Sequence, residues 1–177
     1  YEPCTYMAVC KDGKMGELQK VSFGTKVAEL VDDADVKAIA IGTKLYDASA
    51  MDLVIEADTQ IGNGVITVYS SKCCMIHETE EVLLAERKQS CGKCTFCREG
   101  LIQLHTMVKE ITEGQGKKEF TDMMEEIGEA MTFSTPCTMG QTASDFAMGS
   151  LKYFAGEYED HIKKKKCANN VCSAFMS

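Results

Sequence analysis

The sequence predicts an α+β protein in which a strand-rich first half is followed by a helical second half. Before residue 70, short apolar segments alternate with turn residues, as in small sheets. After it, apolar residues recur at intervals of three and four, as on one face of a helix. The 177 residues suffice for one domain or two small ones. We expect a strand-rich domain over 1–70, a helical domain over 71–166 and a cysteine-containing tail over 167–177.

The first half is predicted to begin with a β-hairpin, because two segments of interleaved polar and apolar residues flank a turn-forming sequence. The half as a whole is interpreted as a packing module rather than a ligand site. Its expected elements are strands over 6–9, 18–23, 36–41 and 65–69, a turn over 11–14, a short helix over 27–31 and a loop over 47–50.

The second half is predicted to form four amphipathic helices. Gly114 and Gly116 separate the second from the third, and Thr135-Pro136 ends the third. Helices of this length bury their apolar stripes most simply as a bundle, in which the methionines are core filler. The four helices are expected over residues 80–89, 101–111, 120–131 and 143–162.

The most informative segment carries Cys91, Cys94 and Cys97, with two residues between successive cysteines. A tight turn with this spacing points three sulfurs in one direction, and a cubane iron–sulfur cluster needs four converging thiolates. Cys137, 40 positions after Cys97, is the candidate for the fourth. Zinc is the competing interpretation, but zinc sites more often show two separated Cys-x-x-Cys pairs or a mixture of Cys and His. The pattern therefore favours an iron–sulfur cluster.

Residues 90–100, SCGKCTFCREG, closely resemble the cluster-binding segment of the NADH-binding flavoprotein subunit (51 kDa type) of respiratory complex I and of soluble NAD-linked iron hydrogenases. The family usually has proline where this chain has Phe96, a change that loosens or re-aims the turn but removes no ligand. The resemblance implies that one [4Fe–4S] cluster is held by Cys91, Cys94, Cys97 and Cys137.

The resemblance extends upstream of the cysteine loop. Residues 61–69 and 74–76 resemble the family's glycine-rich strand and the helix that leads to the cluster loop, and residues 21–30 resemble the start of its small β-grasp (SLBB-like) domain. The first domain is therefore expected to be β-grasp-like. The family's large flavin and NADH domain has no counterpart here, since no G-x-G-x-x-G lies between a strand and a helix. We expect the chain alone to bind neither FMN nor NADH.

A second group of candidate metal ligands lies near the C-terminus. His161, Cys167 and Cys172 fall within twelve residues and form three-quarters of a zinc site. The expected fourth ligand is Cys74, which precedes the first helix and matches a cysteine that members of the resembled family have before the cluster loop. Such a mixed shell suits a structural zinc ion that pins the tail to the helices. The alternative is a frayed tail with free thiols.

Composition limits the remaining possibilities. The net charge of -8 argues against nucleic acid as a partner, and no run of about 18 apolar residues predicts a membrane span. We expect no secretory leader, and ten cysteines with metal-type spacing indicate a reducing cytoplasm and suit an anaerobe. The lysines at 163–166 are expected to be a solvated helix end. No role is assigned to Cys4, Cys10, Cys73, His77 and His105.

The predicted function is that of an electron-relay subunit in a multi-subunit NAD(P)-linked oxidoreductase. A cluster handles single electrons whereas NAD(P)H delivers hydride, so a flavin must lie between them, on a partner flavoprotein. Other iron–sulfur subunits are the expected further partners. Lys93 and Arg98 are expected to tune potential and docking rather than to catalyse a reaction. The alternative function is a non-redox, zinc-binding assembly module.

Overall fold

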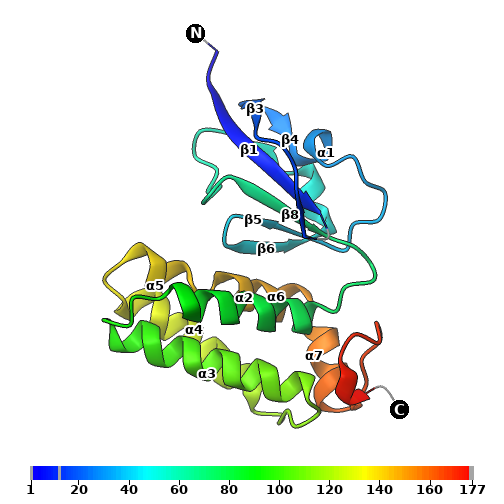
Figure 1. Cartoon of the computed structure of the whole chain (residues 1–177), viewed down its shortest axis with the longest axis vertical. Helices are drawn as coiled ribbons and strands as arrows, with labels where there is room; N and C mark the ends of the chain where they lie inside the picture. The colour runs from blue at the N-terminus through cyan, green and yellow to red at the C-terminus, as the bar shows by residue number, and fades with distance from the viewer. Residues whose placement is uncertain (1, 12, 176–177) are drawn as a thin grey trace. The chain divides into compact units, whose positions relative to one another are not determined.

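The computed structural model describes residues 2–11 and 13–175, and it confirms the mixed α+β class (Figure 1). The chain divides into two compact units between Lys72 and Cys73. The first contains the strands and the second contains the long helices, and the tail belongs to the second unit. Asp12, in the expected hairpin turn, lies outside the described residues.

The first unit is built on a mixed sheet in which neighbouring strands follow the order β2-β1-β8-β5-β6, with β3 also paired to β1. Strands β1 and β8 are parallel, and the other pairs of this sheet are antiparallel. A second, two-stranded sheet joins β4 and β7. The elements are β1 (Cys4–Lys11), β2 (Lys14–Met15), β3 (Gln19–Ser22), β4 (Thr25–Lys26), α1 (Val27–Leu30), β5 (Ala38–Ile41), β6 (Lys44–Asp47), η1 (Ala48–Asp52), β7 (Val54–Ile55) and β8 (Val65–Tyr69).

The core of this unit lies around β5 and β8. All four residues of β5 are buried, which explains why this strand is a continuous apolar run rather than an alternating one. The loop expected over 47–50 is wrong, because a 3-10 helix begins at Ala48. The Asp47 carboxylate starts this helix by accepting a hydrogen bond from the backbone N–H of Ser49 at 3.1 Å.

The second unit contains the helices α2 (Met75–Gln89), α3 (Thr95–Thr112), α4 (Phe120–Ser134), α5 (Thr138–Thr142), α6 (Asp145–Tyr153) and α7 (Ala155–Ile162) and the 3-10 turn η2 (Ser173–Phe175). Helix α3 packs against both α2 and α4, and α6 packs against α2, α4 and α7. Over the described residues, no helix combines the length and the apolar character that crossing a membrane requires.

The single helix expected over 143–162 is wrong, because α6 and α7 are separate and α5 precedes them. Phe154 interrupts the helix with φ −123° and ψ 31°. The break lets the Tyr158 hydroxyl hydrogen-bond Ser150 Oγ at 2.7 Å, between two buried side chains. In an unbroken helix, residues eight apart would be about 12 Å apart along the axis. The predicted four-helix bundle is therefore too simple a description of this unit.

Candidate metal centres

The loop between α2 and α3 brings three cysteines to the N-terminus of a long helix. Ser90 ends α2 in an extended conformation, Gly92 turns the chain with φ +71°, and Cys94 caps α3. A positive φ in this region favours glycine, so Gly92 is required by the turn itself. Cys97 then lies in the first turn of α3.

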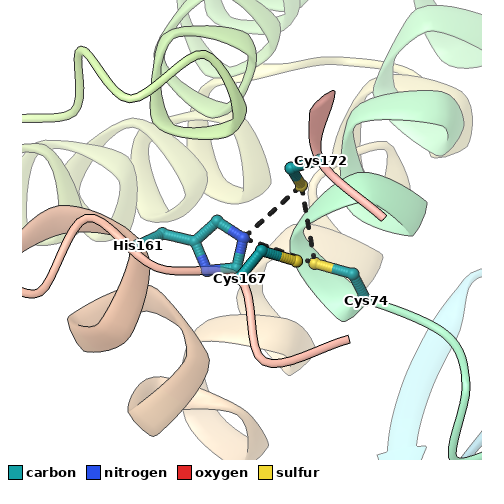
Figure 2. A group of neighbouring side chains, drawn as sticks. All are labelled: Cys74, His161, Cys167 and Cys172. Atoms are coloured by element: carbon teal, nitrogen blue, oxygen red, sulfur yellow. Dashed lines mark hydrogen bonds between the residues drawn. The ribbon is translucent and has the colours of Figure 1, made fainter. Parts of the chain in front are cut away.

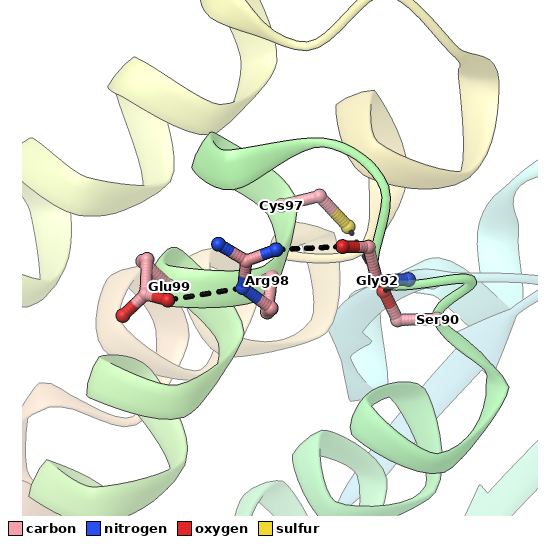
Figure 3. Close-up of polar contacts among 5 residues, drawn as sticks. All are labelled: Ser90, Gly92, Cys97, Arg98 and Glu99. Carbon is pink, nitrogen blue, oxygen red and sulfur yellow. Dashed lines mark hydrogen bonds and ion pairs between the residues drawn. The ribbon is translucent and has the colours of Figure 1, made fainter.

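Hydrogen bonds fix the shape of this loop (Figure 3). Ser90 Oγ accepts from the backbone N–H of Gly92 at 3.3 Å and lies 3.6 Å from Cys97 Sγ. Arg98 Nη1 donates to the Gly92 carbonyl oxygen at 2.7 Å, and its Nε donates to Glu99 at 3.1 Å. The loop is therefore tied to both flanking helices.

The four cysteines of the predicted cluster site surround one cavity of about 180 Å³. Cys137 reaches it as the residue that precedes α5, just after α4 has ended. The cavity suits a polynuclear iron–sulfur cluster, since its donors are thiols and they surround a space rather than a point. Its lining residues are Gln89, Ser90, Cys91, Cys94, Cys97, Cys137 and Met139.

The cavity is open to solvent on one side. Cys91 and Cys137 are exposed, Cys94 is half-buried and Cys97 is buried. An anionic centre here would also lie at the positive end of the α3 dipole, where free backbone N–H groups favour negative charge. Phe96 lies within the first turn of α3 and is exposed, so the loop forms without the proline that is usual in the resembled family.

A second group of ligand-type atoms comes together in the same unit (Figure 2). The Sγ atoms of three cysteines and a nitrogen of the His161 ring all lie within 4.8 Å of one another, and all four side chains are buried. Cys74 precedes α2, His161 lies in the last turn of α7, and the remaining two are in the tail. The structure thus brings together the four residues that the sequence grouped: Cys74, His161, Cys167 and Cys172.

The distances in this group match a mononuclear site. Cys74 Sγ lies 3.8 Å from Cys172 Sγ, and His161 Nε2 lies 3.5 Å from both sulfurs. A tetrahedral zinc ion, with its usual bond lengths, places two sulfur ligands about 3.8 Å apart and a sulfur and a nitrogen about 3.5 Å apart. These three side chains are therefore spaced as ligands of one tetrahedral ion, and Cys167 lies within 4.8 Å of each of them.

The Cys74 and His161 side chains shift one another's pKa values. The hydrogen bond from Cys172 lowers the pKa of the Cys74 thiol to about 3, against the opposing effect of burial. Burial lowers the pKa of His161, but the hydrogen bond to Cys74 and the Cys74 charge outweigh it and raise this pKa to about 9. His161 Nδ1 donates to the Glu157 carbonyl oxygen at 2.8 Å, which leaves Nε2 facing the sulfurs. Such an outer hydrogen bond orients metal-binding histidines.

The tail, residues 167–177, is packed over its described part rather than frayed. Cys167 and Cys172 are buried, and the Phe175 ring meets the His161 ring edge-on at 5.2 Å. Lys165 Nζ donates to the carbonyl oxygens of Gly114 and Gly116 at 2.9 and 3.1 Å. Lys165 therefore fastens the segment just before the tail to the loop that follows α3, so this lysine is not simply solvated.

His105 and His77 lie outside the two groups of candidate ligands. His105 Nε2 donates to Glu80 at 2.7 Å, and Arg87 Nη1 donates to His105 Nδ1 at 2.7 Å, so this buried ring holds α2 and α3 together. His77, Glu80 and Glu81 approach within 4.8 Å on the surface of α2. Because Glu80 is already bonded to His105, we assign no metal to that group.

Sequence reasoning missed Ser90 and this Glu80–His105–Arg87 network. Glu80 and Arg87 lie seven residues apart on α2, which is about two helical turns. This spacing could have shown that both side chains lie on the same face of the helix. Ser90 carried no comparable signal, because its contact depends on the turn at Gly92.

Residues 78–161 match the family described as the NADH-ubiquinone oxidoreductase-F iron-sulfur binding region. The chain is 32% identical over 117 residues to the NADP-reducing hydrogenase subunit HndC of Solidesulfovibrio fructosivorans, covering 66% of this chain and 24% of that protein. It is 28% identical over 122 residues to the mitochondrial NADH-ubiquinone oxidoreductase 51 kDa subunit of Neurospora crassa, covering 68% of this chain and 25% of that protein.

A solved structure shows a similar fold over most of the chain. The crystal structure of the NAD+-reducing [NiFe]-hydrogenase in the H2-reduced state aligns with a TM-score of 0.82 and 18% identity, covering 90% of this chain and 30% of the matched one. This likeness concerns the fold alone.

The chain is thus similar to subunits of NADP- and NADH-linked oxidoreductases, and the match includes an iron–sulfur binding region. More specifically, the match of residues 78–161 to the NADH-ubiquinone oxidoreductase-F iron-sulfur binding region confirms the resemblance seen in the cysteine loop. The chain spans about a quarter of the length of these curated relatives. The matched segment includes all the cysteines of the loop cavity but excludes Cys74, Cys167 and Cys172.

Proposed function

We propose that this chain is the electron-relay part of a multi-subunit NAD(P)-linked oxidoreductase and holds one [4Fe–4S] cluster. The observation that carries the proposal is the cavity lined by Cys91, Cys94, Cys97 and Cys137, inside a segment that matches an iron–sulfur binding region. When bound, such a cluster accepts and donates one electron at a time.

The chain's own residues hold the cluster and tune its reduction potential, and we propose no catalytic step for them. The loop cysteines supply thiolates, the N-terminus of α3 favours their negative charge, and Arg98 keeps the loop closed through the Gly92 carbonyl. Because hydride carries two electrons, a flavin on a partner chain must divide them before they reach this site. We therefore propose a flavoprotein and further iron–sulfur subunits as partners. We also propose that the first unit is a β-grasp domain that serves in assembly.

We further propose that Cys74, His161, Cys167 and Cys172 hold one structural zinc ion. The support is the tetrahedral spacing of the Cys74, His161 and Cys172 donor atoms together with the burial of all four side chains, which leaves no open position for a substrate. The ion would join the start of α2 to the tail, two places far apart in the sequence.

The cluster assignment is tested by Cys137→Ser, with Cys4→Ser as a control at a cysteine outside both sites. In anaerobically reconstituted protein, Cys137→Ser should hold well under four irons per chain and lose the brown absorbance, whereas Cys4→Ser should match the parent. Full iron in Cys137→Ser contradicts the assignment. A colourless parent protein that contains only zinc would support the non-redox assembly module instead.

The zinc assignment is tested by elemental analysis of Cys167→Ala. The parent should contain about one zinc per chain, and the variant should lose it while keeping its iron. Loss of both metals would mean that the two sites are not independent, and full zinc retention would remove Cys167 from the ligand set.

A further inference from the structure

Ser90 is placed to donate a hydrogen bond to one sulfur of the cluster loop. Its Oγ lies 3.6 Å from Cys97 Sγ and accepts the backbone N–H of Gly92 at 3.3 Å (Figure 3). Ser90 ends α2, whereas Cys97 lies in the first turn of α3, so this contact joins the two ends of the loop. Ser90 also lines the cavity together with the four cysteines.

The direction of this hydrogen bond follows from the chemistry of its atoms. A cysteine that ligates iron is a thiolate and has no proton to donate. The Ser90 hydroxyl has one proton and two lone pairs, and the Gly92 N–H already occupies one lone pair. The hydroxyl proton is therefore directed to Cys97 Sγ.

Cys97 is the sulfur at which such a bond has the greatest effect. It is 4% exposed, whereas Cys91 and Cys137 are exposed to solvent. Hydrogen bonds are electrostatically stronger in a buried environment, where water competes less. Met139 Sδ, 3.9 Å from Cys97 Sγ, contributes polarisable surface but no proton.

We propose that Ser90 is a positioning residue that orients Cys97 and raises the reduction potential of the cluster. An added electron increases the negative charge on the ligand sulfurs, so a proton donor at Cys97 stabilises the reduced state more than the oxidised state. This inference rests on the proposed function, because it requires Cys97 to be a cluster ligand.

The experiment compares Ser90→Ala with Ser90→Thr, which keeps the hydroxyl, in the full chain with its cluster reconstituted. Thr112→Ala is the matched control, because it removes a hydroxyl from the same unit about 22 Å along α3 from Cys97. The Thr112 hydroxyl donates only to a local carbonyl, that of Lys109 at 2.7 Å. Iron and sulfide content, the midpoint potential and the EPR spectrum are measured for each.

We expect Ser90→Ala to keep its iron and to shift the midpoint potential to more negative values, while Ser90→Thr and Thr112→Ala stay near the parent. An unshifted potential in iron-loaded Ser90→Ala overturns the inference. If Ser90→Ala does not take up a cluster, the test uses the parent protein and Ser90→Thr after exchange into D₂O. Pulsed EPR should then show an exchangeable deuteron coupled to the reduced cluster that persists in Ser90→Thr, and its absence overturns the inference.

These outcomes separate the inference from the function on which it rests. A parent protein that binds no iron refutes the proposed cluster and with it the role of Ser90. If the parent protein holds a complete cluster but Ser90→Ala leaves the midpoint potential unchanged, only the role of Ser90 is refuted.

Discussion

The proposed zinc ion should stabilise the helical unit by closing a long loop, and Cys74→Ala is the substitution that isolates this effect. Cys74 and Cys172 are separated by 98 positions, whereas His161 and Cys172 are separated by only 11. Removing Cys74 therefore opens the long loop and leaves the three local ligands in place. By the chain-entropy relation for cross-links, closing a loop of about 100 residues contributes about 4.7 kcal/mol.

This loss should be large compared with the stability of an ordinary domain, which is about 5–15 kcal/mol. For a unit of roughly 100 residues it corresponds to a fall in Tm of about 20 °C. The assay is thermal and urea unfolding of the full chain, followed by far-ultraviolet circular dichroism, with zinc content measured on the same samples. Cys73→Ala, one residue away and outside the ligand group, is the control and should change stability far less.

A zinc chelator provides a second arm of this test. It should lower the free energy of unfolding of the parent to about that of Cys74→Ala. It should change the stability of Cys74→Ala little, because that variant already lacks the long-range cross-link. If Cys74→Ala lowers the free energy of unfolding by less than about 1 kcal/mol, the loop-closure reasoning is refuted.

Three further outcomes are expected. Tyr158→Phe removes the buried hydrogen bond to Ser150 and should cost about 1 kcal/mol, seen as a fall in Tm of about 5 °C; an unchanged Tm would show that this bond does not hold the α6–α7 break together. Burial raises the pKa of Glu86 and the Asp145 charge adds to this, so the folded state holds the Glu86 proton more tightly and the free energy of unfolding falls as pH rises above about 4.5. Glu86→Gln should therefore be more stable than the parent at pH 7 but not at pH 4, a difference that the exposed control Glu81→Gln should lack. The chain alone should bind no FMN and reduce no artificial acceptor with NADH, so stoichiometric flavin together with diaphorase activity would contradict the relay function.

The sequence predicted most reliably the features that depend on local spacing. The cysteine loop, the start of α4 at Phe120 and the strand at 65–69 follow from patterns within a few residues of one another. Cys137 and Cys74 were assigned with help from the family resemblance, and the structure places each beside the group to which the sequence assigned it.

The errors arose where tertiary contacts override local pattern. The apolar repeat continues through Phe154 and therefore does not show the break between α6 and α7. The buried hydrogen bond between Ser150 and Tyr158 gives the break its structural reason. The 3-10 helix after Asp47 was likewise missed, because its residues are equally compatible with a loop.

Helix α2 explains why both candidate metal sites belong to one unit. Cys74 lies immediately before its first residue and Ser90 immediately after its last, so its 15 residues separate the two sites by about 22 Å. Zinc has no redox chemistry of its own. The Cys74 site can therefore fix where α2 begins without taking part in electron transfer. The Ser90 contact fixes the other end of the same helix against Cys97, so the anchoring and redox roles fall at opposite ends of one rigid element.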